Sequence, residues 1–481
     1  MTTTASTTLR DRAVEVLCDP ALRHVVDLIA YVDDGAIVVA NAGGLARLGA
    51  DATEVVAGRN PVLDQDPLAF TPLTAELADV SPPNERNSYP DAHRRLASLF
   101  RAPAAPDIAV VHTGSHYWPD KGGHRGEHGS LNVVQSRAPL ILSGAGVTER
   151  GFLAASARTI DVAPTLAWLA GVPLGQLSDM EGAALVDVLV PEARHVIGLL
   201  WDGCNSNSLY ALAKAGELPN VARLLSQGCA FVGGAIAEFP SVTLVNHTCA
   251  LTGVGPGRHG IVNNAYFDRA TAAQRLTNDA RTWHRWAEWL HDGVRTVFER
   301  IDEPTACVNE PADAGADYST FELVRSAGHS DGAKSMNSML PDPSVDMLAT
   351  QEYVGTDPDY AWSSSVDAIG LEQMLSLWPS LSEAPRLTWW NNLLPDTGHH
   401  AGGPHSSVAH ASMRDADARL GVLLDHLEKI GALDQTTILL TSDHGSEGAD
   451  PECVGDWDEP LHAAGIEFRD EAYGFIYLGH S

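Results

Sequence analysis

The sequence predicts a mixed α/β fold, with a mainly parallel central sheet flanked by helices. Short apolar runs of strand length end in polar residues: HVIGLLW before Asp202, RLTWWNNLLP before Asp396 and TTILLTS before Asp443. Between them lie amphipathic stretches such as ADARLGVLLDHLEKIGAL, whose apolar residues recur at i, i+3 and i+4 as in helices packed on a sheet. This alternation is typical of βαβ units. Because functional residues gather beyond the carboxyl ends of parallel strands, we expect the three acids to converge in one crevice.

The composition excludes several classes of protein. The 481 residues are 44% hydrophobic and 19% charged, which suits a globular chain with a large core. The 31 Lys and Arg stand against 62 Asp and Glu, a formal net charge of −31. Such a surface repels nucleic-acid backbones and anionic lipid. We therefore expect no nucleic-acid-binding face and no membrane association, and the sequence leaves the oligomeric state open.

The N-terminal segment MTTTASTTLRDRAVEV lacks an apolar core of signal-peptide length, and no stretch reaches the ~18 apolar residues of a membrane span. A cytoplasmic protein is the resulting expectation. The six cysteines are scattered without CxxC spacing, which argues against a zinc ribbon, a redox pair or a disulfide framework.

The other regions are predicted to contain a hairpin, a short helix, a further strand and an insertion. VVDLIAYVDDGAIVVANAGG predicts a β-hairpin around an Asp34-Gly35 turn, and YPDAHRRLASLF predicts a short helix. DIAVV before His112 has the apolar character of the buried parallel strands. Residues from about 265 to 385 are irregular, rich in Asp, Ser, Trp and Pro, and lack the strand-then-acid pattern. We interpret them as a cap-like or substrate-selecting insertion, since long loops are usually functional.

Thr243 is the candidate nucleophile. It lies just before an apolar-periodic run that predicts a helix. The free N–H groups and the dipole at a helix N-terminus favour an anion such as phosphate, so this hydroxyl is placed to attack one. Taken alone, a threonine at this position is more often an N-cap. Only the surrounding motifs favour a nucleophile over an N-cap at this position.

Two acid–histidine clusters predict metal binding. Asp396 and His400 are spaced i, i+4 in the Gly-rich loop PDTGHHAGGP, and Asp443 and His444 are adjacent in TSDHG. Carboxylate oxygen and imidazole nitrogen are ligands of zinc and manganese, and two clusters suggest two divalent ions. One such pair alone is weak evidence. Two pairs at strand ends, with Asp202 at a third strand end, favour metal binding.

Four motifs resemble the alkaline phosphatase superfamily and, within it, the type I phosphodiesterase/nucleotide pyrophosphatase branch. They are VIGLLWDG, FPSVTLVNH with HGIVNN behind it, DTGHHAGGP and SDHG. The resemblance implies two ions, with zinc expected and manganese as the alternative. It also implies that Thr243 is the nucleophile and that Asn246 donates a hydrogen bond to a non-bridging phosphoryl oxygen. The implied ligands are Asp202, Thr243, Asp443 and His444 for one ion, and Asp396 and His400 for the other.

The resemblance further requires a third ligand for the second ion, a histidine after the DHG motif. Only His462 and His480 follow it, and neither has the expected HG context. That context occurs upstream, in GEHGS, followed by PLILSG as a strand and IDVAPTLAWLAG as a helix. We infer a circular permutation in which residues 1–190 supply the carboxyl-terminal portion of the fold and residues 195–481 supply the nucleophile- and metal-bearing portion. His128 is then the ligand, with His124, His462 and His480 as alternatives.

The implied function is metal-dependent hydrolysis of phosphodiester or nucleotide pyrophosphate bonds in a small-molecule substrate. Two ions can stabilise both oxygens of an in-line displacement, here through a covalent phosphothreonine. An asparagine, in place of an arginine clamp, favours diesters or phosphonates over dianionic monoesters. The alternatives are a phosphonoacetate-type C–P hydrolase or phosphomonoesterase of the same superfamily, and a catalytically silent metal-binding protein. An independent domain at residues 1–190 is the alternative to permutation.

Overall fold

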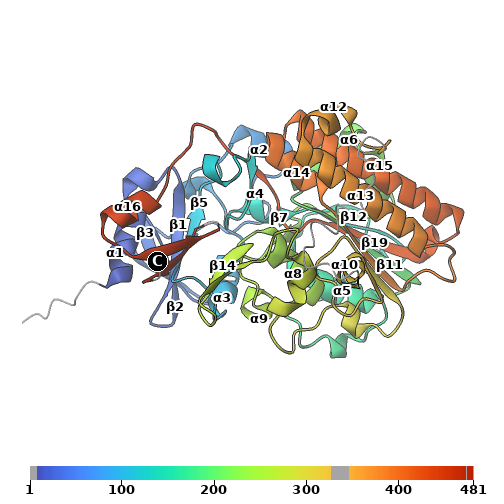
Figure 1. Ribbon diagram of the computed structural model, residues 1–481, viewed down its shortest axis with the longest axis horizontal. Helices are drawn as coiled ribbons and strands as arrows, with labels where there is room; N and C mark the ends of the chain where they lie inside the picture. Colours follow the sequence, from blue (N-terminus) through green and yellow to red (C-terminus); the bar gives the residue numbers. More distant parts are fainter. Residues whose placement is uncertain (1–7, 327–345, 473, 480–481) are drawn as a thin grey trace, which may run out of the picture.

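Two β-sheets form the framework of the protein, which we describe from a computed structural model covering residues 8–326, 346–472 and 474–479. Within these residues the larger, central sheet has eight strands. In spatial order they are β17 (Tyr318–Ser319), β16 (Thr305–Val308), β18 (Leu387–Asn392), β11 (His195–Trp201), β19 (Thr436–Thr441), β8 (Leu140–Gly144), β12 (Gly228–Phe231) and β9 (Gly151–Leu153). A smaller sheet lies at the other end of the molecule (Figure 1).

The middle of the central sheet is parallel. β11 pairs in parallel with both β18 and β19, and β16 pairs in parallel with β18. All residues of β11, β18 and β19 are buried, as their apolar sequences predict for strands covered on both faces. β8 alone runs antiparallel to its two neighbours, β19 and β12. The predicted mixed α/β fold with a mainly parallel sheet is confirmed.

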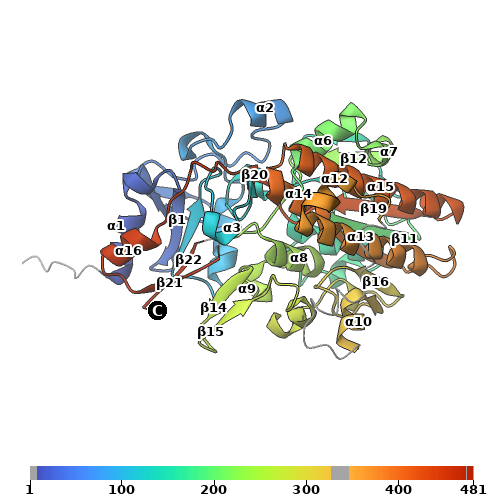
Figure 2. The same ribbon diagram turned by 45° about the horizontal axis from the view of Figure 1, so that its top comes forward.

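Helices cover both faces of this sheet (Figures 1 and 2). Successive side chains of β18 alternate between them: Trp389 joins the core that includes α5 (Val162–Leu169) and α8 (Thr243–Thr252), and Trp390 joins the opposite core. That second core is formed with α6 (Ser206–Ala215), α7 (Pro219–Ser226), α13 (Pro358–Leu377) and α15 (Ser407–Lys429). The helices predicted at ADARLGVLLDHLEKIGAL and IDVAPTLAWLAG are thus present, as α15 and α5.

The smaller sheet is antiparallel and has seven strands within the described residues. Their order is β21 (Phe468–Glu471), β22 (Phe475–Leu478), β5 (Ile108–His112), β1 (Val26–Asp33), β2 (Ala36–Asn41), β3 (Gly44–Leu48) and β4 (Thr53–Gly58). The predicted hairpin is β1–β2, and Asp34 and Gly35 both have positive φ (49° and 78°), as a tight hairpin turn requires. Leu96 of the predicted short helix, α3 (Ala92–Phe100), packs against this sheet.

The expectation that DIAVV forms a parallel strand is wrong. This segment is β5, which pairs antiparallel with β1 on one side and with β22 on the other. A five-residue apolar run indicates a buried strand but carries no information on which sheet the strand joins.

The expectation that residues 265–385 are irregular and lack the strand-then-acid pattern is also wrong in part. β16 and β17 fall inside this region and extend the central sheet beyond β18. The segment also contains a hairpin of β14 (Ala265–Asp268) and β15 (Ala273–Leu276), and the helices α10 (Thr320–Ser326) and α12 (Gln351–Thr356). β16 is only four residues long, too short for its apolar pattern to stand out. Residues 327–345 of the predicted insertion lie outside the described residues.

Segments from both halves of the chain share the central sheet and its core. β8 lies between β19 and β12, and Leu140 and Leu166 belong to the same buried cluster as Trp389 and Leu439. Across the described residues, none of the helices is both long and apolar enough to cross a membrane. The cytoplasmic location stays a prediction.

Candidate metal centre and nucleophile

The carboxyl ends of two neighbouring strands bring three candidate ligands together. Asp202 follows β11, and Asp443 and His444 follow β19, whose Thr441 is paired with Leu200. All three side chains are buried. The Nε2 of His444 lies 3.0 Å from Asp443 Oδ2 and 3.9 Å from Asp202 Oδ1. The predicted convergence of these residues therefore follows directly from the parallel pairing of β11 and β19.

Asp396 and His400 lie on a helix, α14 (Leu394–Gly402), and not in a loop as the Gly-rich sequence predicts. Their i, i+4 spacing puts both on one helical face, with His400 Nε2 at 3.1 Å from Asp396 Oδ2. The Nδ1–H of His400 donates to the carbonyl oxygen of Gly126 at 2.7 Å, which leaves Nε2 for a ligand. The glycines of α14 serve packing, because a Cβ at Gly398 would stand 2.3 Å from Ser412 Oγ.

His128 reaches this cluster through a short strand pair. β6 (Gly126–Glu127) pairs antiparallel with β20 (Glu447–Gly448), just after His444 in the chain. The His128 ring stacks on His444 with 3.8 Å between centroids and lies 5.1 Å from that of His400. Its Nδ1 lies 3.2 Å from the carbonyl oxygen of Ser241. Ligand atoms of His128, Asp396 and His400 all lie within 4.8 Å of one another.

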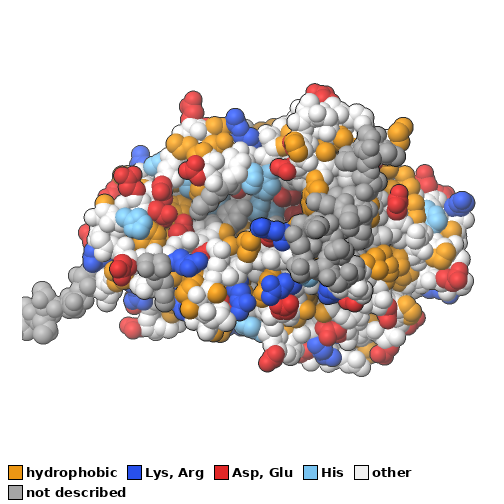
Figure 3. Space-filling model, in the orientation of Figure 1, with side chains coloured by type: hydrophobic (Ala, Val, Ile, Leu, Met, Phe, Trp, Pro, Cys, Tyr) orange, Lys and Arg blue, Asp and Glu red, His pale blue; other side chains and the backbone are white. Residues whose placement is uncertain are grey.

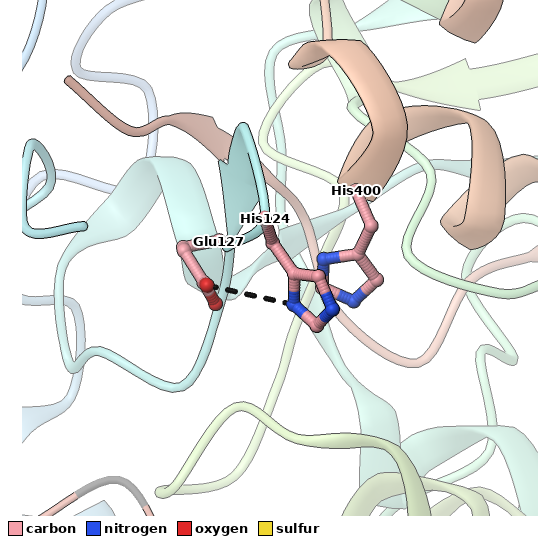
Figure 4. Close-up of side chains that lie close together, drawn as sticks. All are labelled: His124, Glu127 and His400. Carbon is pink, nitrogen blue, oxygen red and sulfur yellow. Dashed lines mark ion pairs between the residues drawn. The ribbon is translucent and has the colours of Figure 1, made fainter. Parts of the chain in front are cut away.

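Of the alternatives to His128, His124 lies beside the cluster and His462 lies elsewhere. His124 is beside the cluster, its ring 3.9 Å from that of His400 and its Nδ1 3.5 Å from Glu127 Oε1 (Figure 4). His462 packs against Phe468 of the smaller sheet, with 4.7 Å between ring centroids. His480 lies outside the described residues.

Thr243 is the first residue of α8. The N-cap is Val242, which makes no side-chain capping hydrogen bond, so the N-cap interpretation of Thr243 is wrong. Thr243, Asp202 and His247 line one cavity, which places the hydroxyl beside the carboxylate cluster at a helix N-terminus. Histidine side chains lie in a hollow near the middle of the face drawn in Figure 3.

The residues present fit divalent cations. Four buried ligand atoms make no hydrogen bond, although three of them lie within ion-pair distance of one another: Asp202 Oδ1, Asp396 Oδ1, Asp443 Oδ2 and His444 Nε2. Leaving such atoms buried and unpaired costs free energy, and a cation bound by carboxylate oxygen and imidazole nitrogen removes that cost. Among the described residues, three further groups besides the one around His128 have ligand atoms within 4.8 Å of one another. They are Asp202, Asp396 and His444; Asp202, His247 and Asp443; and His124, Glu127 and His400.

The electrostatics of the cluster are those of closely packed opposite charges. Burial, with the negative charge of Asp443, raises the pKa of Asp202 to about 7. Burial also opposes ionisation of Asp443, but the charge of His444 outweighs it and lowers the Asp443 pKa to about 2. The charge of Asp396 likewise overcomes burial at His400 and raises its pKa to about 10.

His247 and Glu310 belong to the site and escaped the sequence analysis. His247 is one helical turn after Thr243 on α8, with its Nε2 3.5 Å from Asp202 Oδ2 and 3.6 Å from Asp443 Oδ2. Its Nδ1 lies 2.9 Å from Glu310 Oε2. Burial opposes protonation of His247, but Glu310 and Asp202 outweigh it and hold its pKa well above the ordinary range. The i, i+4 spacing from Thr243 was a signal available in the sequence.

Asn246 is occupied by the backbone before α8. Its Oδ1 accepts from the N–H of Glu238 at 2.7 Å, and its Nδ2 lies 3.1–3.3 Å from the carbonyl oxygens of Glu238, Pro240 and Val242. These bonds use the amide fully and fix the turn that leads into Thr243. The geometry therefore does not support the expected hydrogen bond to a phosphoryl oxygen.

Asn264, from the HGIVNN motif, is better placed for that bond. Its Oδ1 accepts from the N–H of Leu244 at 3.1 Å, which ties it to the first turn of α8 beside Thr243. That contact fixes the amide oxygen and leaves the Nδ2 donor. Sequence alone gave no means of choosing between the two asparagines, because both lie in the same motif.

The fold and the site together define a mixed α/β protein with carboxylate–histidine groups that could hold metal ions, beside a threonine at a helix N-terminus. The family model for type I phosphodiesterase/nucleotide pyrophosphatase matches residues 196–481, more than half of the sequence. The chain belongs to this family.

Relatives of known sequence are similar over part of their length. An uncharacterised pyrophosphatase/phosphodiesterase of Schizosaccharomyces pombe is 28% identical over 279 residues, which cover 57% of this chain and 49% of that protein. Human ectonucleotide pyrophosphatase/phosphodiesterase family member 1 is 24% identical over 236 residues, which cover 48% of this chain and 21% of that one. The chain thus spans half or less of the length of these relatives.

Among solved structures, murine ectonucleotide pyrophosphatase/phosphodiesterase 5 superimposes with a TM-score of 0.39 at 17% identity, covering 58% of this chain and 64% of that one. Phosphonoacetate hydrolase from Sinorhizobium meliloti, solved with phosphonoacetate, gives a TM-score of 0.35 at 20% identity, covering 53% of this chain and 58% of that one.

Proposed function

We propose that this protein is a metal-dependent hydrolase of phosphodiester or nucleotide pyrophosphate bonds that acts through a covalent phosphothreonine at Thr243. The observation that carries the proposal is the position of Thr243 at the start of α8, in one cavity with Asp202. There a hydroxyl, a helix N-terminus and unpartnered carboxylate oxygen atoms meet. Membership of the family supports the same reaction class.

Two groups of residues would hold the ions. Asp202, Asp443 and His444 would hold one beside Thr243, and Asp396, His400 and His128 would hold the other. Bound divalent ions supply positive charge that stabilises the attacking and leaving oxygens of an in-line displacement. Zinc and manganese both suit these oxygen and nitrogen donors.

The residues around the ligands have separate tasks. His247, held by Glu310, keeps Asp202 and Asp443 side by side. Asn264 Nδ2 and the backbone N–H groups of the first turn of α8 are donors for the phosphoryl oxygen that gains charge in the transition state. We therefore assign to Asn264 the role that the sequence suggested for Asn246.

We also propose that residues 1–190 and 195–481 are portions of one catalytic fold in permuted order. The position of β8 between β19 and β12 supports this proposal, as does the stacking of His128 on His444. An independent domain at residues 1–190 would not contribute a strand to the interior of the central sheet.

The test uses purified protein loaded with zinc or manganese. We expect release of p-nitrophenolate from bis-p-nitrophenyl phosphate, and two metal ions per chain by elemental analysis. Bound metal without turnover would favour a silent metal-binding protein. Turnover of phosphonoacetate with no turnover of any diester would favour the C–P hydrolase alternative.

A further inference from the structure

A small cavity lies beside Thr243, and Asp202 and His247 of the candidate metal groups form part of its wall. Its walls include Leu244, Trp283, Pro311 and Leu393, and the space left for the centres of water-sized groups is about 20 Å³. A single ordered water needs roughly 10–15 Å³ by the same measure. The cavity therefore suits a compact end group of a substrate and not a flat ring system.

Two amide oxygens on the wall of this cavity have no partner. Asn309 and Asn391 both line it, both are 3% exposed, and the Oδ1 atom of each lacks a hydrogen bond. The other end of each amide is fixed, since Asn309 Nδ2 donates to the carbonyl oxygen of Val366 at 3.0 Å and Asn391 Nδ2 donates to that of Asn309 at 3.2 Å. Each side chain is therefore fixed by its Nδ2, and its Oδ1 can accept a hydrogen bond from a ligand. Buried acceptors without partners are costly, which makes them a recognition feature.

The charge of the cavity wall disfavours anions. No lysine or arginine lines it within the described residues, and the one histidine on its wall, His247, lies 2.9–3.6 Å from carboxylate oxygens of Glu310, Asp202 and Asp443. At the wall formed by Asn309 and Asn391, a carboxylate or second phosphate would meet two amide oxygens and no lysine or arginine. An N–H or O–H group would instead satisfy the two orphaned acceptors.

The position of the cavity indicates which part of the substrate enters it. It is lined by Thr243, Asp202 and His247, and by none of Asp396, His400 and His128. In an in-line displacement the leaving group departs on the side away from the nucleophile, toward the second group of ligands. The cavity beside Thr243 therefore receives the substituent that stays on phosphorus.

We propose that Asn309 and Asn391 form a specificity site for a compact, non-anionic substituent retained on phosphorus, which donates N–H or O–H hydrogen bonds to their Oδ1 atoms. The inference rests on the proposed function and narrows it to diesters with a small hydroxyalkyl or aminoalkyl group. It also separates this enzyme from phosphonoacetate hydrolysis, in which the substrate carries a carboxylate beside the phosphoryl group.

The test compares four p-nitrophenyl phosphodiesters whose second substituent is propyl, 2-hydroxyethyl, 2-aminoethyl or carboxymethyl, with uncatalysed rates subtracted. The first three have the same number of heavy atoms, and all share one leaving group. For the metal-loaded protein we expect kcat/KM to be at least about tenfold higher for the hydroxyethyl and aminoethyl esters than for the propyl ester. The carboxymethyl ester should be at least about tenfold poorer than the propyl ester.

The variant Asn391→Leu removes one acceptor. We expect the ratio of hydroxyethyl to propyl kcat/KM to fall toward one, and this ratio, not the absolute rate of the variant, reports the loss of the acceptor. Equal kcat/KM for all four esters in the unsubstituted protein, or a preference for the carboxymethyl ester, overturns the specificity site and leaves the hydrolase function intact. That comparison does not depend on the stability of the variant. Release of p-nitrophenolate from none of the esters, nor from bis-p-nitrophenyl phosphate, overturns the function itself.

Discussion

His128 and His444 stack face to face, with 3.8 Å between ring centroids and 20° between ring planes. The contact joins parts of the chain that are far apart in sequence, and it exists because β6 and β20 pair with Glu127 opposite Glu447. Asn132 strengthens the same junction, donating a 2.9 Å hydrogen bond to Glu447 Oε2 across 315 positions. The group of His128, Asp396 and His400 therefore forms only when β6 pairs with β20.

Replacing His128 tests that dependence. We expect His128→Ala to lower both activity and the occupancy of the second metal, with at least about a hundredfold weaker metal binding, because a direct ligand is lost. His462→Ala is the matched control, since that ring packs on Phe468 in the smaller sheet. Elemental analysis and kcat measured side by side check this. A larger effect at His462 would refute the permuted arrangement.

Replacing Thr243 tests the nucleophile. We expect Thr243→Ala to lower kcat by at least about a thousandfold, because no other hydroxyl takes its place, while most of the bound metal remains. Thr252→Ala is the control on the same helix, since its hydroxyl bonds only the carbonyl oxygen of Thr248. Turnover of bis-p-nitrophenyl phosphate at the unsubstituted rate by Thr243→Ala would rule out the phosphothreonine.

Replacing Asn264 and replacing Asn246 should have different effects on activity and stability. Asn264→Ala should lower kcat by about ten- to a thousandfold with little change in stability, because it removes a donor to the transition state. Asn246→Ala should instead lower the free energy of unfolding by about 2–4 kcal/mol, because it removes four buried backbone contacts. Denaturant unfolding and steady-state kinetics on both variants distinguish these effects, and the reverse pattern would restore the role to Asn246.

Removing the metal should destabilise the fold. A ligand that binds only the folded state at a hundred to a thousand times its Kd contributes about 3–4 kcal/mol. The cluster buries three carboxylates whose free oxygens need a cation. Treatment with a chelator is therefore expected to lower the thermal midpoint and abolish turnover, with both restored by zinc or manganese. A midpoint that does not move would argue against a resident metal.

Asp27 predicts a pH dependence of stability that is separate from catalysis. Burial raises its pKa from 3.8 to about 6, against a 2.7 Å hydrogen bond from the Tyr89 hydroxyl. The folded state holds this proton more tightly than the unfolded state, so unfolding releases it between about pH 4 and 6. The free energy of unfolding therefore falls as the pH rises through that range, by up to about 3 kcal/mol. Asp27→Asn should flatten this slope in denaturant titrations. An unchanged slope would show that other groups cause it.

Much of the framework was predictable from local patterns. The strands β11, β18 and β19 are wholly buried, and the apolar runs that precede Asp202, Asp396 and Asp443 in the sequence indicated them. β16 was not predictable, because four residues give no period and its neighbour β18 is distant in sequence. β5 was predicted to be a parallel strand but belongs to the antiparallel sheet. Its partners are also distant in sequence, and tertiary packing determines which strands pair.

The candidate site, like the fold, was predictable from the sequence only in part. The ligands could be read from residue type and spacing, because metal chemistry restricts both. The orientation of an amide could not, which is why the sequence analysis proposed Asn246 and did not consider Asn264. Glu310 escaped because it joins the site through its contact with His247, and that contact requires the segment after β16 to lie beside α8.

The pairing of β22 with β5 has a consequence for biosynthesis. β5 is translated early and has its second neighbour only when the much later residues of β22 leave the ribosome. Until then the nascent chain presents an open apolar strand edge, a template on which chaperones or other nascent chains can pair. A translation product that stops before Phe475 retains that edge for its whole lifetime.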